Sequence, residues 1–351
     1  MKSPFSIFIG FILCLYFLVG CKRKETYHFP ILQFSTELKI TSTSVKNQGN
    51  WPASWIYATL SMIESERIAL HDSINLSATF LERMYCEQLI QEYQMQTKCN
   101  PIWKDFSGTP FRCLELAEKY GMLTYASFRP QLVLTWPQMR TYLDSLAQAN
   151  CAKQNYQIIL DTSFAYLPPY ISLYGATYTS IDLMRSVLQK NSYEAFSPYS
   201  TLSKNKINHF HLLGDSHNIS YQSIKQKDIM STIITTLKRG HSLVWIGDTA
   251  IYSYSSRAGL ALEPNPEKYS KNLERYEKKI MNSPLHSLHI IGIAHQIKRQ
   301  FCPIGDGSSV FLIAKDSHGK QGHYKGFIYL SENFIKSHTA AIYRLKPQFW
   351  Q

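Results

Sequence analysis

The order of the periodic segments is the strongest constraint on the fold of this chain. Apolar residues recur at helical spacing in the first half, as at Trp55, Ala58 and Met62. Short runs with the composition and alternation of β-strands dominate the later part of the chain. Helices that precede strands in this way predict an α+β fold.

The individual elements follow from the same patterns. Helices are predicted over 55–70, 77–93, 109–120, 136–149 and 228–239. Strands are predicted over 38–43, 242–246, 286–294, 310–314, 326–330 and 341–345, and the run 156–160 is also strand-like. The segment 47–53 is rich in Asn, Gly and Pro, which predicts a loop directly before the first helix.

The N-terminus has the form of a secretory signal. Lys2 precedes an apolar run over 5–19, which is shorter than the about 20 residues that a membrane span needs. The segment Leu18-Val19-Gly20-Cys21 resembles the bacterial lipobox, whose Cys receives a diacylglyceryl group after cleavage. We therefore expect a signal peptide over 1–20 and a lipidated Cys21. An uncleaved signal anchor is the alternative.

A lipidated Cys21 would place the protein in a bacterial cell envelope. Residues 21–35 would form a tether, in which Lys22, Arg23 and Lys24 lie beside anionic lipid headgroups. Lysine directly after the Cys does not resemble an inner-membrane retention signal, so the expected location is the outer membrane.

Size and charge describe the remaining chain. About 330 residues remain, with 44% hydrophobic and 18% charged residues overall, which is typical of a globular protein. One domain of two packed halves over 36–351 is the simplest organisation. The net charge of +12 is spread along the chain without a compact basic run, so nucleic-acid binding is not expected. A basic surface facing anionic lipid or an acidic polymer is the simpler interpretation.

The cysteines suggest little chemistry. Five remain once Cys14 is removed and Cys21 is lipidated, so at least one stays free or pairs between chains. Cys86, Cys99 and Cys113 lie close together in the sequence, and a bridge among them is plausible in an oxidising compartment. No CxxC pair is present, and no Cys or carboxylate completes a metal-ligand set with His209, His211 and His217. No nucleotide-binding loop is evident, so neither a metal nor another cofactor is expected.

The loop before the first helix carries the strongest functional signal. Gln48 lies six positions ahead of Ser54, which is followed by Trp55. This spacing resembles the active-site segment of the papain family of cysteine peptidases, with Ser54 at the position of the nucleophilic Cys. The resemblance implies a two-lobed fold. Its helical lobe would cover about 45–125, an insertion about 126–225 and a β lobe about 226–346.

Two later segments extend the resemblance. Leu285-His286-Ser287-Leu288-His289 resembles the family's His strand, in which the His lies six positions before a Gly; this selects His286, and His289 would be structural. Lys315-Asp316-Ser317-His318-Gly319 resembles the "Lys-Asn-Ser-Trp-Gly" segment. Asp316 then takes the position of the Asn that orients the His. His318 takes the position of the Trp that covers the hydrogen bond between that His and Asn.

Other segments resemble the bleomycin hydrolase branch of this family. They are Trp245-Ile246-Gly247-Asp248 and the run from Tyr324 to Glu332. A long insertion between the nucleophile and the His also occurs in that branch. The resemblance implies a peptide or protein as substrate or ligand. It does not give the oligomeric state.

Two hypotheses for function follow from the resemblance, and a third is that the motif match is accidental in an unrelated sensor or binding lipoprotein. In the first, Ser54 is a nucleophile, His286 its base, Asp316 the orienting group and Gln48 an oxyanion donor, because Ser-His-Asp sets work on unrelated folds. In the second, the chain is an inactive homologue that binds peptides or serves as a scaffold. Trp51-Pro52, expected on the cleft wall, and His318 favour the second hypothesis, whereas the retained Gln48 and His286 favour the first.

Each residue also has a simpler structural interpretation. Ser54 is a suitable N-cap of the helix that follows it. His286 suits a buried, hydrogen-bonded strand position, and Asp316 suits a turn. Trp55 is expected in the core under either hypothesis.

Overall fold

The computed structural model describes most of the chain beyond the N-terminus. The described residues are 27–94, 106–129, 134–148, 156–199, 211–215, 220–267, 273–297 and 306–350. The expected signal peptide over 1–20 and the lipid attachment at Cys21 lie outside them, and so does most of the tether over 21–35. Within the described residues, none of the helices combines the length and apolar content needed to cross a bilayer.

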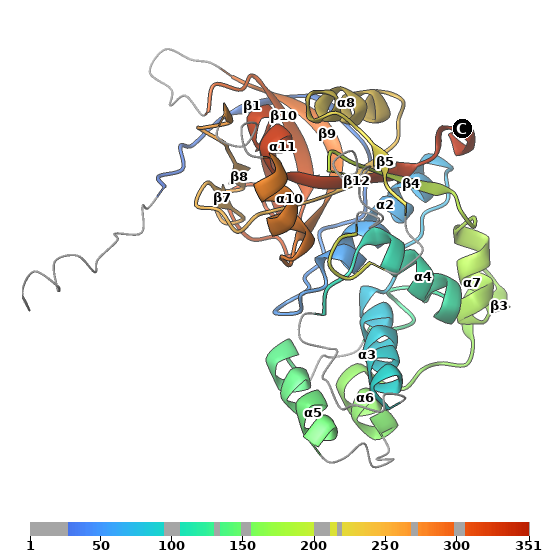
Figure 1. The fold of residues 1–351 in the computed structure, drawn as a ribbon. Helices are drawn as coiled ribbons and strands as arrows, with labels where there is room; N and C mark the ends of the chain where they lie inside the picture. The colour runs from blue at the N-terminus through green and yellow to red at the C-terminus, as the bar shows by residue number, and fades with distance from the viewer. Residues whose placement is uncertain are drawn as a thin grey trace, which may run out of the picture.

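Helices make up one side of the molecule (Figure 1). They are α2 (Ser54–Ala69), α3 (Ala78–Gln94), α4 (Pro110–Tyr120), α5 (Trp136–Gln148), α6 (Tyr156–Phe164) and α7 (Ser180–Val187). The helix α2 is the central one, since every residue from Ser54 to Glu66 is buried. It packs against α3 and α4 on one side and against the sheet on the other.

A large, mostly antiparallel sheet makes up the other side. Its strands run in the order β5-β4-β12-β6-β9-β10-β11-β8-β7, and β1 pairs with β9. The bounds are β1 (Phe34–Lys39), β4 (Tyr193–Ser197), β5 (Gln222–Ser223), β6 (Leu243–Gly247), β7 (Tyr254–Ser255), β8 (Leu260–Ala261), β9 (His286–Gln296), β10 (Val310–Lys315), β11 (Phe327–Ser331) and β12 (Thr339–Leu345). The short strands β2 (Ile171–Leu173) and β3 (Ala176–Tyr178) form a separate hairpin.

Further helices accompany the sheet. They are α8 (Ile229–Lys238), preceded by the 3-10 turn η2 (Gln226–Asp228), together with α10 (Leu273–Met281), α11 (Glu332–His338) and the 3-10 turn η3 (Pro347–Phe349). One core cluster joins the helical side to the sheet through Val244 and Ile246 of β6. A second lies between the opposite face of the sheet and α8 and α11, where Ile233, Trp245 and Phe334 are buried.

Most predicted elements are present with boundaries shifted by a few residues. The strand expected at 38–43 begins earlier, at Phe34, and ends at Lys39. Strands β4 and β5 fall within the stretch expected as an insertion and belong to the large sheet. The mixed α+β architecture agrees with the predicted fold class.

The prediction of a strand over 156–160 is wrong, because these residues lie in helix α6. The buried residues Leu160 and Phe164 are four positions apart and face the core, whereas Ile158 is exposed. On the same helix, Gln157 and Asp161 both accept hydrogen bonds from Arg83 of α3. These contacts have the spacing of a helix face, and the isolated apolar run could not reveal them.

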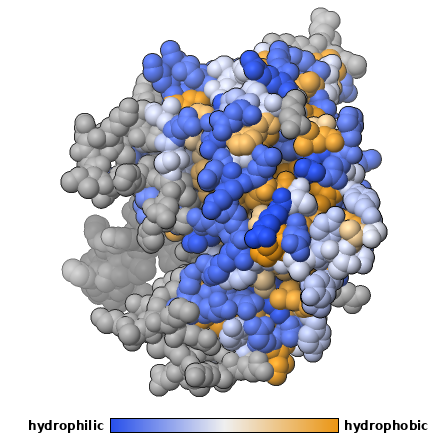
Figure 2. Space-filling model, turned by 90° about the vertical axis from the view of Figure 1, so that its right-hand side faces the viewer, coloured by the Kyte–Doolittle hydropathy of each residue, from blue (hydrophilic) through white to orange (hydrophobic). Residues whose placement is uncertain are grey.

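The cysteines and the surface agree with a globular protein. Cys86 and Cys113 are buried free thiols, so no bridge joins them, and Cys99 lies outside the described residues. On the face shown in Figure 2, hydrophilic residues form most of the surface and hydrophobic residues lie between them.

Candidate functional site

Ser54 is the first residue of helix α2. The N-cap position belongs to Ala53, so the interpretation of Ser54 as the cap is wrong. Its Oγ instead accepts a hydrogen bond from the backbone N–H of Ser287 at 3.1 Å. Ser54 is buried, with 4% of its surface exposed. The contact ties the start of α2 to the start of β9, which brings Ser54 next to the segment that carries His286.

The loop that carries Gln48 is joined to the loop that carries Asp316. The N–H of Gln48 donates to the carbonyl of Ser317 at 2.7 Å, and the N–H of Gly319 donates to the carbonyl of Lys46 at 3.0 Å. The hydroxyl of Ser317 also donates to Oε1 of Gln48. These bonds connect two segments that lie about 270 positions apart in the sequence.

Gln48 is therefore held in one orientation. Its side-chain Nε2 donates to the backbone carbonyl of Trp51 at 2.6 Å, while Oε1 accepts from Ser317. Gln48 is buried and lines the same cavity as Ser54. A fixed amide beside a helix N-terminus has the properties of a preorganised donor.

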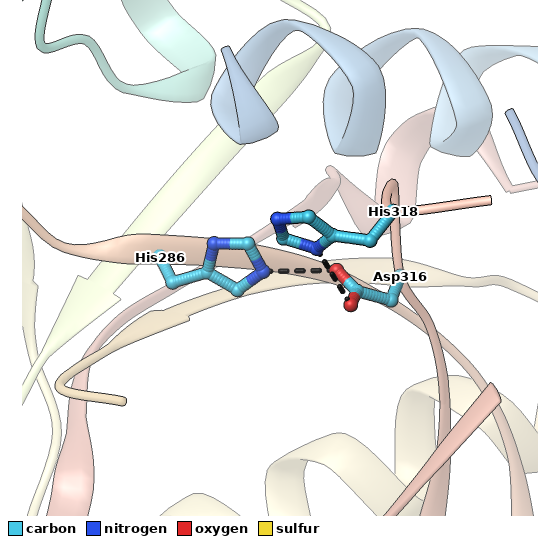
Figure 3. Close-up of side chains that lie close together, drawn as sticks. All are labelled: His286, Asp316 and His318. Carbon is cyan, nitrogen blue, oxygen red and sulfur yellow. Dashed lines mark hydrogen bonds and ion pairs between the residues drawn. The ribbon is translucent and has the colours of Figure 1, made fainter. Parts of the chain in front are cut away.

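His286 and Asp316 are directly hydrogen-bonded. His286 begins β9 and Asp316 follows the last residue of β10, which is the neighbouring strand. The Nε2 atom of His286 lies 2.9 Å from Oδ1 of Asp316 (Figure 3). The same carboxylate oxygen accepts from the N–H of Ser317 at 2.8 Å. This contact leaves Nδ1 of His286 as the ring nitrogen for other chemistry.

His318 binds the other oxygen of the same carboxylate. Its Nδ1 lies 2.9 Å from Oδ2 of Asp316, and its ring stacks on that of His286 with centroids 5.4 Å apart (Figure 3). The side chain of His318 is 43% exposed, whereas that of Asp316 is 2% exposed. His318 thus covers the His286–Asp316 bond on its solvent side.

The two histidines keep Asp316 ionised. Burial alone would raise the pKa of Asp316, but the hydrogen bonds and positive charge of His286 and His318 outweigh burial and hold it well below its usual range. The hydrogen bond to Asp316 in turn raises the pKa of His318, against the opposing effect of burial. A carboxylate that stays charged next to an imidazole stabilises the imidazolium form.

Ser54 and His286 line one cavity of about 100 Å³. Its other walls come from several places in the sequence: Gln48, Pro52 and Trp55, the turn at 107–109, Leu212 and Leu213, Ile246, and Pro284 and Leu285. No hydrogen bond joins Ser54 to His286, both of which are described residues. The two side chains therefore share one cavity, while the hydroxyl of Ser54 is hydrogen-bonded to the backbone N–H of Ser287.

Leu212 and Leu213 form part of the wall of the cavity that Ser54 lines. Their turn is held by Asp215, which accepts hydrogen bonds from Thr109 at 2.6 Å and from the N–H of Leu212 at 2.8 Å. Gly214 approaches the backbone of Ser107 so closely that a Cβ would lie 2.4 Å from its carbonyl oxygen. The walls of the cavity are therefore fixed by specific contacts.

Trp51 does not line the cavity, and the expectation that it alters the cleft wall is wrong. It is 2% exposed and packs against Phe106, Trp136 and Phe164, with ring centroids 5.3 to 5.5 Å apart. Only Pro52 of the Trp51-Pro52 pair faces the cavity. Trp51 is a core residue of the helical side.

His289 and Trp55 have the structural positions expected for them. His289 is fully buried, and its Nδ1 lies 2.8 Å from the hydroxyl of Ser61 in α2. Burial, with a smaller contribution from Lys315, lowers the pKa of His289 well below its ordinary value. Trp55 is buried and donates from Nε1 to the carbonyl of Phe106 at 3.2 Å.

Comparison with solved structures identifies the fold. PepW from Lactobacillus rhamnosis is similar with a TM-score of 0.59 and 15% sequence identity, over 90% of this chain and 83% of that one. This chain has the papain-like α+β fold. No family model and no curated protein sequence matches it.

Two further papain-like structures resemble it less closely. SERA5E from Plasmodium falciparum has a TM-score of 0.45 and 12% identity, covering 91% of this chain and 97% of that one. A structure from a study of the mite allergens Blo t 1 and Der p 1 has a TM-score of 0.42 and 12% identity, covering 93% of this chain and 74% of that one.

Four residues that contribute to the site were not predicted from the sequence. The N–H of Ser287 holds the hydroxyl of Ser54, and the hydroxyl of Ser317 holds Gln48. Ser287 directly follows His286 and Ser317 directly follows Asp316, so their positions in the sequence could have indicated that they lie at the site. Leu212 and Leu213 line the cavity more than 150 positions after Ser54, and no motif marks them.

Proposed function

We propose that this chain is a papain-fold hydrolase of peptide bonds that uses Ser54 in place of a thiol. The proposal rests on one arrangement: His286 shares a cavity with Ser54 and is hydrogen-bonded through Nε2 to the buried carboxylate of Asp316. A nucleophile, a base and a group that orients the base are the components that such chemistry requires.

The reaction would proceed by general-base catalysis. A serine hydroxyl is far less acidic than a thiol, so no resting anion forms, and proton removal accompanies attack. Ser54 Oγ would attack the scissile carbonyl while Nδ1 of His286 takes its proton. The ionised Asp316 stabilises the resulting imidazolium. His286 would then protonate the leaving amine, and water would hydrolyse the acyl group by the reverse sequence.

The oxyanion that develops during attack needs hydrogen-bond donors close to Ser54. Ser54 lies at the N-terminus of α2, where backbone N–H groups lack helical acceptors and the helix dipole is positive. Gln48 lines the cavity next to it, with its amide held by Trp51 and Ser317. These groups supply the electrostatic stabilisation that is usually the largest contribution to acyl transfer.

The cellular setting belongs to the same proposal. The lipobox-like segment that ends at Cys21 supports a lipid-anchored protein of a bacterial cell envelope, most simply at the outer membrane. The segments around Trp245 and Tyr324 support a relationship with the bleomycin hydrolase branch. Peptides that reach the envelope would be the substrates.

A second function is favoured by a specific observation. Ser54 is 4% exposed, its Oγ accepts from Ser287, and the cavity beside it is small and walled by Leu212 and Leu213. In this candidate function the chain is an inactive homologue that binds peptides through the retained cleft. The hydroxyl would then serve only to connect α2 with β9.

A serine-directed fluorophosphonate probe distinguishes the two functions. The chain without residues 1–20 is treated with the probe beside Ser54→Ala and Ser54→Cys. Labelling of the parent that disappears in Ser54→Ala supports hydrolysis. An unlabelled parent, together with a Ser54→Cys variant that reacts with a thiol-directed probe, supports an intact cleft without a competent nucleophile. An unlabelled parent and an unreactive Ser54→Cys variant support a binding role.

A further inference from the structure

His286, Asp316 and His318 form a cluster of metal-ligand type. Nε2 of His286, Nδ1 of His318 and the carboxylate of Asp316 provide one ligand atom each, and these atoms all lie within 4.8 Å of one another. In Figure 3 both imidazoles point their nitrogen at the same carboxylate. We propose that these three residues bind one Zn²⁺ ion, which reversibly blocks hydrolysis at Ser54.

The distances fit a shared metal after a small rearrangement. Zn²⁺ binds imidazole nitrogen and carboxylate oxygen at about 2.0–2.2 Å in tetrahedral geometry, so two neighbouring ligand atoms on one ion lie about 3.4 Å apart. The two N···O distances are both 2.9 Å, and each nitrogen faces a different oxygen of Asp316. A carboxylate between two imidazoles, with a fourth position left to solvent, is a donor set that zinc accepts.

The cluster borders a second cavity, which Ser54 does not line. Asp316 and His318 line a cavity of about 300 Å³ whose other walls include Arg257, Gly319 and Gln321. His318 is half-exposed, so its ring can adjust to a metal without disturbing the core. Arg257 is exposed, and solvent ions screen its charge. The buried carboxylate of Asp316 is also held by the N–H of Ser317, which donates to Oδ1.

Zinc at this place would stop the proposed chemistry. A neutral imidazole has one nitrogen with a free lone pair. If Zn²⁺ takes Nε2 of His286, Nδ1 carries the hydrogen and cannot accept the proton of Ser54. The ion also replaces both hydrogen bonds to Asp316. This consequence rests on the proposed hydrolysis, whereas zinc binding itself does not.

Zinc binding is measured by calorimetry on metal-free Ser54→Ala protein. We expect one equivalent of Zn²⁺ to bind, and His318→Gln or Asp316→Asn in the same background to weaken binding by about tenfold or more. His318→Cys should restore it, because a thiolate is also a zinc ligand. The matched control is His295→Gln. His295 lies on β9, as His286 does, and pairs with Glu37 of β1 at 2.7 Å, but it lies outside the cluster.

Two results would overturn the zinc site. The first is that Zn²⁺ does not bind to Ser54→Ala protein. The second is that His318→Gln leaves Zn²⁺ binding unchanged, with circular dichroism showing that both proteins are folded. Inhibition is tested on the parent by fluorophosphonate labelling with zinc and then with a chelator. Labelling that zinc suppresses and the chelator restores is the expected result, and zinc-insensitive labelling contradicts the inhibition. A parent that never labels contradicts the proposed hydrolysis, while the calorimetry still decides the zinc site.

Discussion

Nε2 of His286 lies 2.9 Å from Oδ1 of Asp316, although the two residues are 30 positions apart in the sequence. The contact exists because β9 and β10 are neighbouring strands, with His286 at the start of one and Asp316 just after the end of the other. Ser287, which follows His286, binds the hydroxyl of Ser54. One strand end therefore positions both the imidazole and the candidate nucleophile.

Replacing Asp316 tests whether its charge supports the imidazole. Asp316→Asn keeps the size of the side chain but removes the negative charge that stabilises the imidazolium of His286. We expect the rate of fluorophosphonate labelling at Ser54 to fall by about 10²-fold or more. Asp72→Asn, which removes a carboxylate paired with Arg67 at the opposite end of α2 from Ser54, is the control. Equal rates in Asp316→Asn and the parent would rule out this role.

Removing the amide of Gln48 tests the oxyanion site. Gln48→Ala eliminates a donor that lines the cavity next to Ser54. Loss of one such donor costs about 10²–10³ in catalytic rate, and we expect an effect of that size on peptide hydrolysis. Ser317→Ala removes only the hydroxyl that orients Gln48, so its effect should be smaller. A Gln48→Ala rate within a factor of about two of the parent would contradict the assignment.

The buried carboxyl of Glu82 should make stability depend on pH. Burial raises its pKa to about 8, and the nearby hydroxyl of Tyr57 offsets only part of this effect. Because the folded pKa lies above the unfolded value, the contribution of Glu82 to stability is complete below about pH 4.5 and is lost as the pH rises to about 8. The loss would reach up to about 4 kcal/mol.

Urea unfolding at several pH values measures this contribution. We expect Glu82→Gln to flatten the decline in unfolding free energy between about pH 5 and pH 8. The control is Glu118→Gln, which removes an exposed carboxyl of α4. A decline that is equally steep in Glu82→Gln and the parent would show that Glu82 does not cause it.

Trp51 is expected to matter for stability. Its ring contacts Phe106, Trp136 and Phe164 in the core of the helical side. Trp51→Ala should lower the unfolding free energy by about 3–5 kcal/mol, and Trp51→Phe should lower it less because much of the aromatic packing remains. Chemical denaturation of both variants gives the values. A loss below about 1 kcal/mol in Trp51→Ala would contradict its place in the core.

The fold was predictable where one pattern covers a whole element. Helix α2 shows helical spacing from Trp55 onward, and β9 and β10 contain apolar runs over 290–294 and 310–314, so their positions follow from the sequence. Helix α6 was predicted wrongly because its partners, Arg83 above all, come from a distant helix. Local spacing contains no information about such contacts.

The candidate site was predictable to a similar extent. The resemblance selected Gln48, Ser54, His286 and Asp316, and the structure brings these residues together around one cavity and one hydrogen-bonded pair. It placed Trp51 wrongly, because a position in an aligned segment does not say which way the side chain points. The turn with Leu212 and Leu213 was not anticipated, since tertiary contacts alone bring it to the cavity.

The most direct test of hydrolysis at Ser54 is mass spectrometry of the intact chain after fluorophosphonate treatment, followed by peptide mapping. The proposed mechanism predicts one adduct per chain, located on the peptide that contains Ser54, and no adduct in Ser54→Ala. An unmodified parent, or an adduct on a different residue, would contradict Ser54 as the nucleophile.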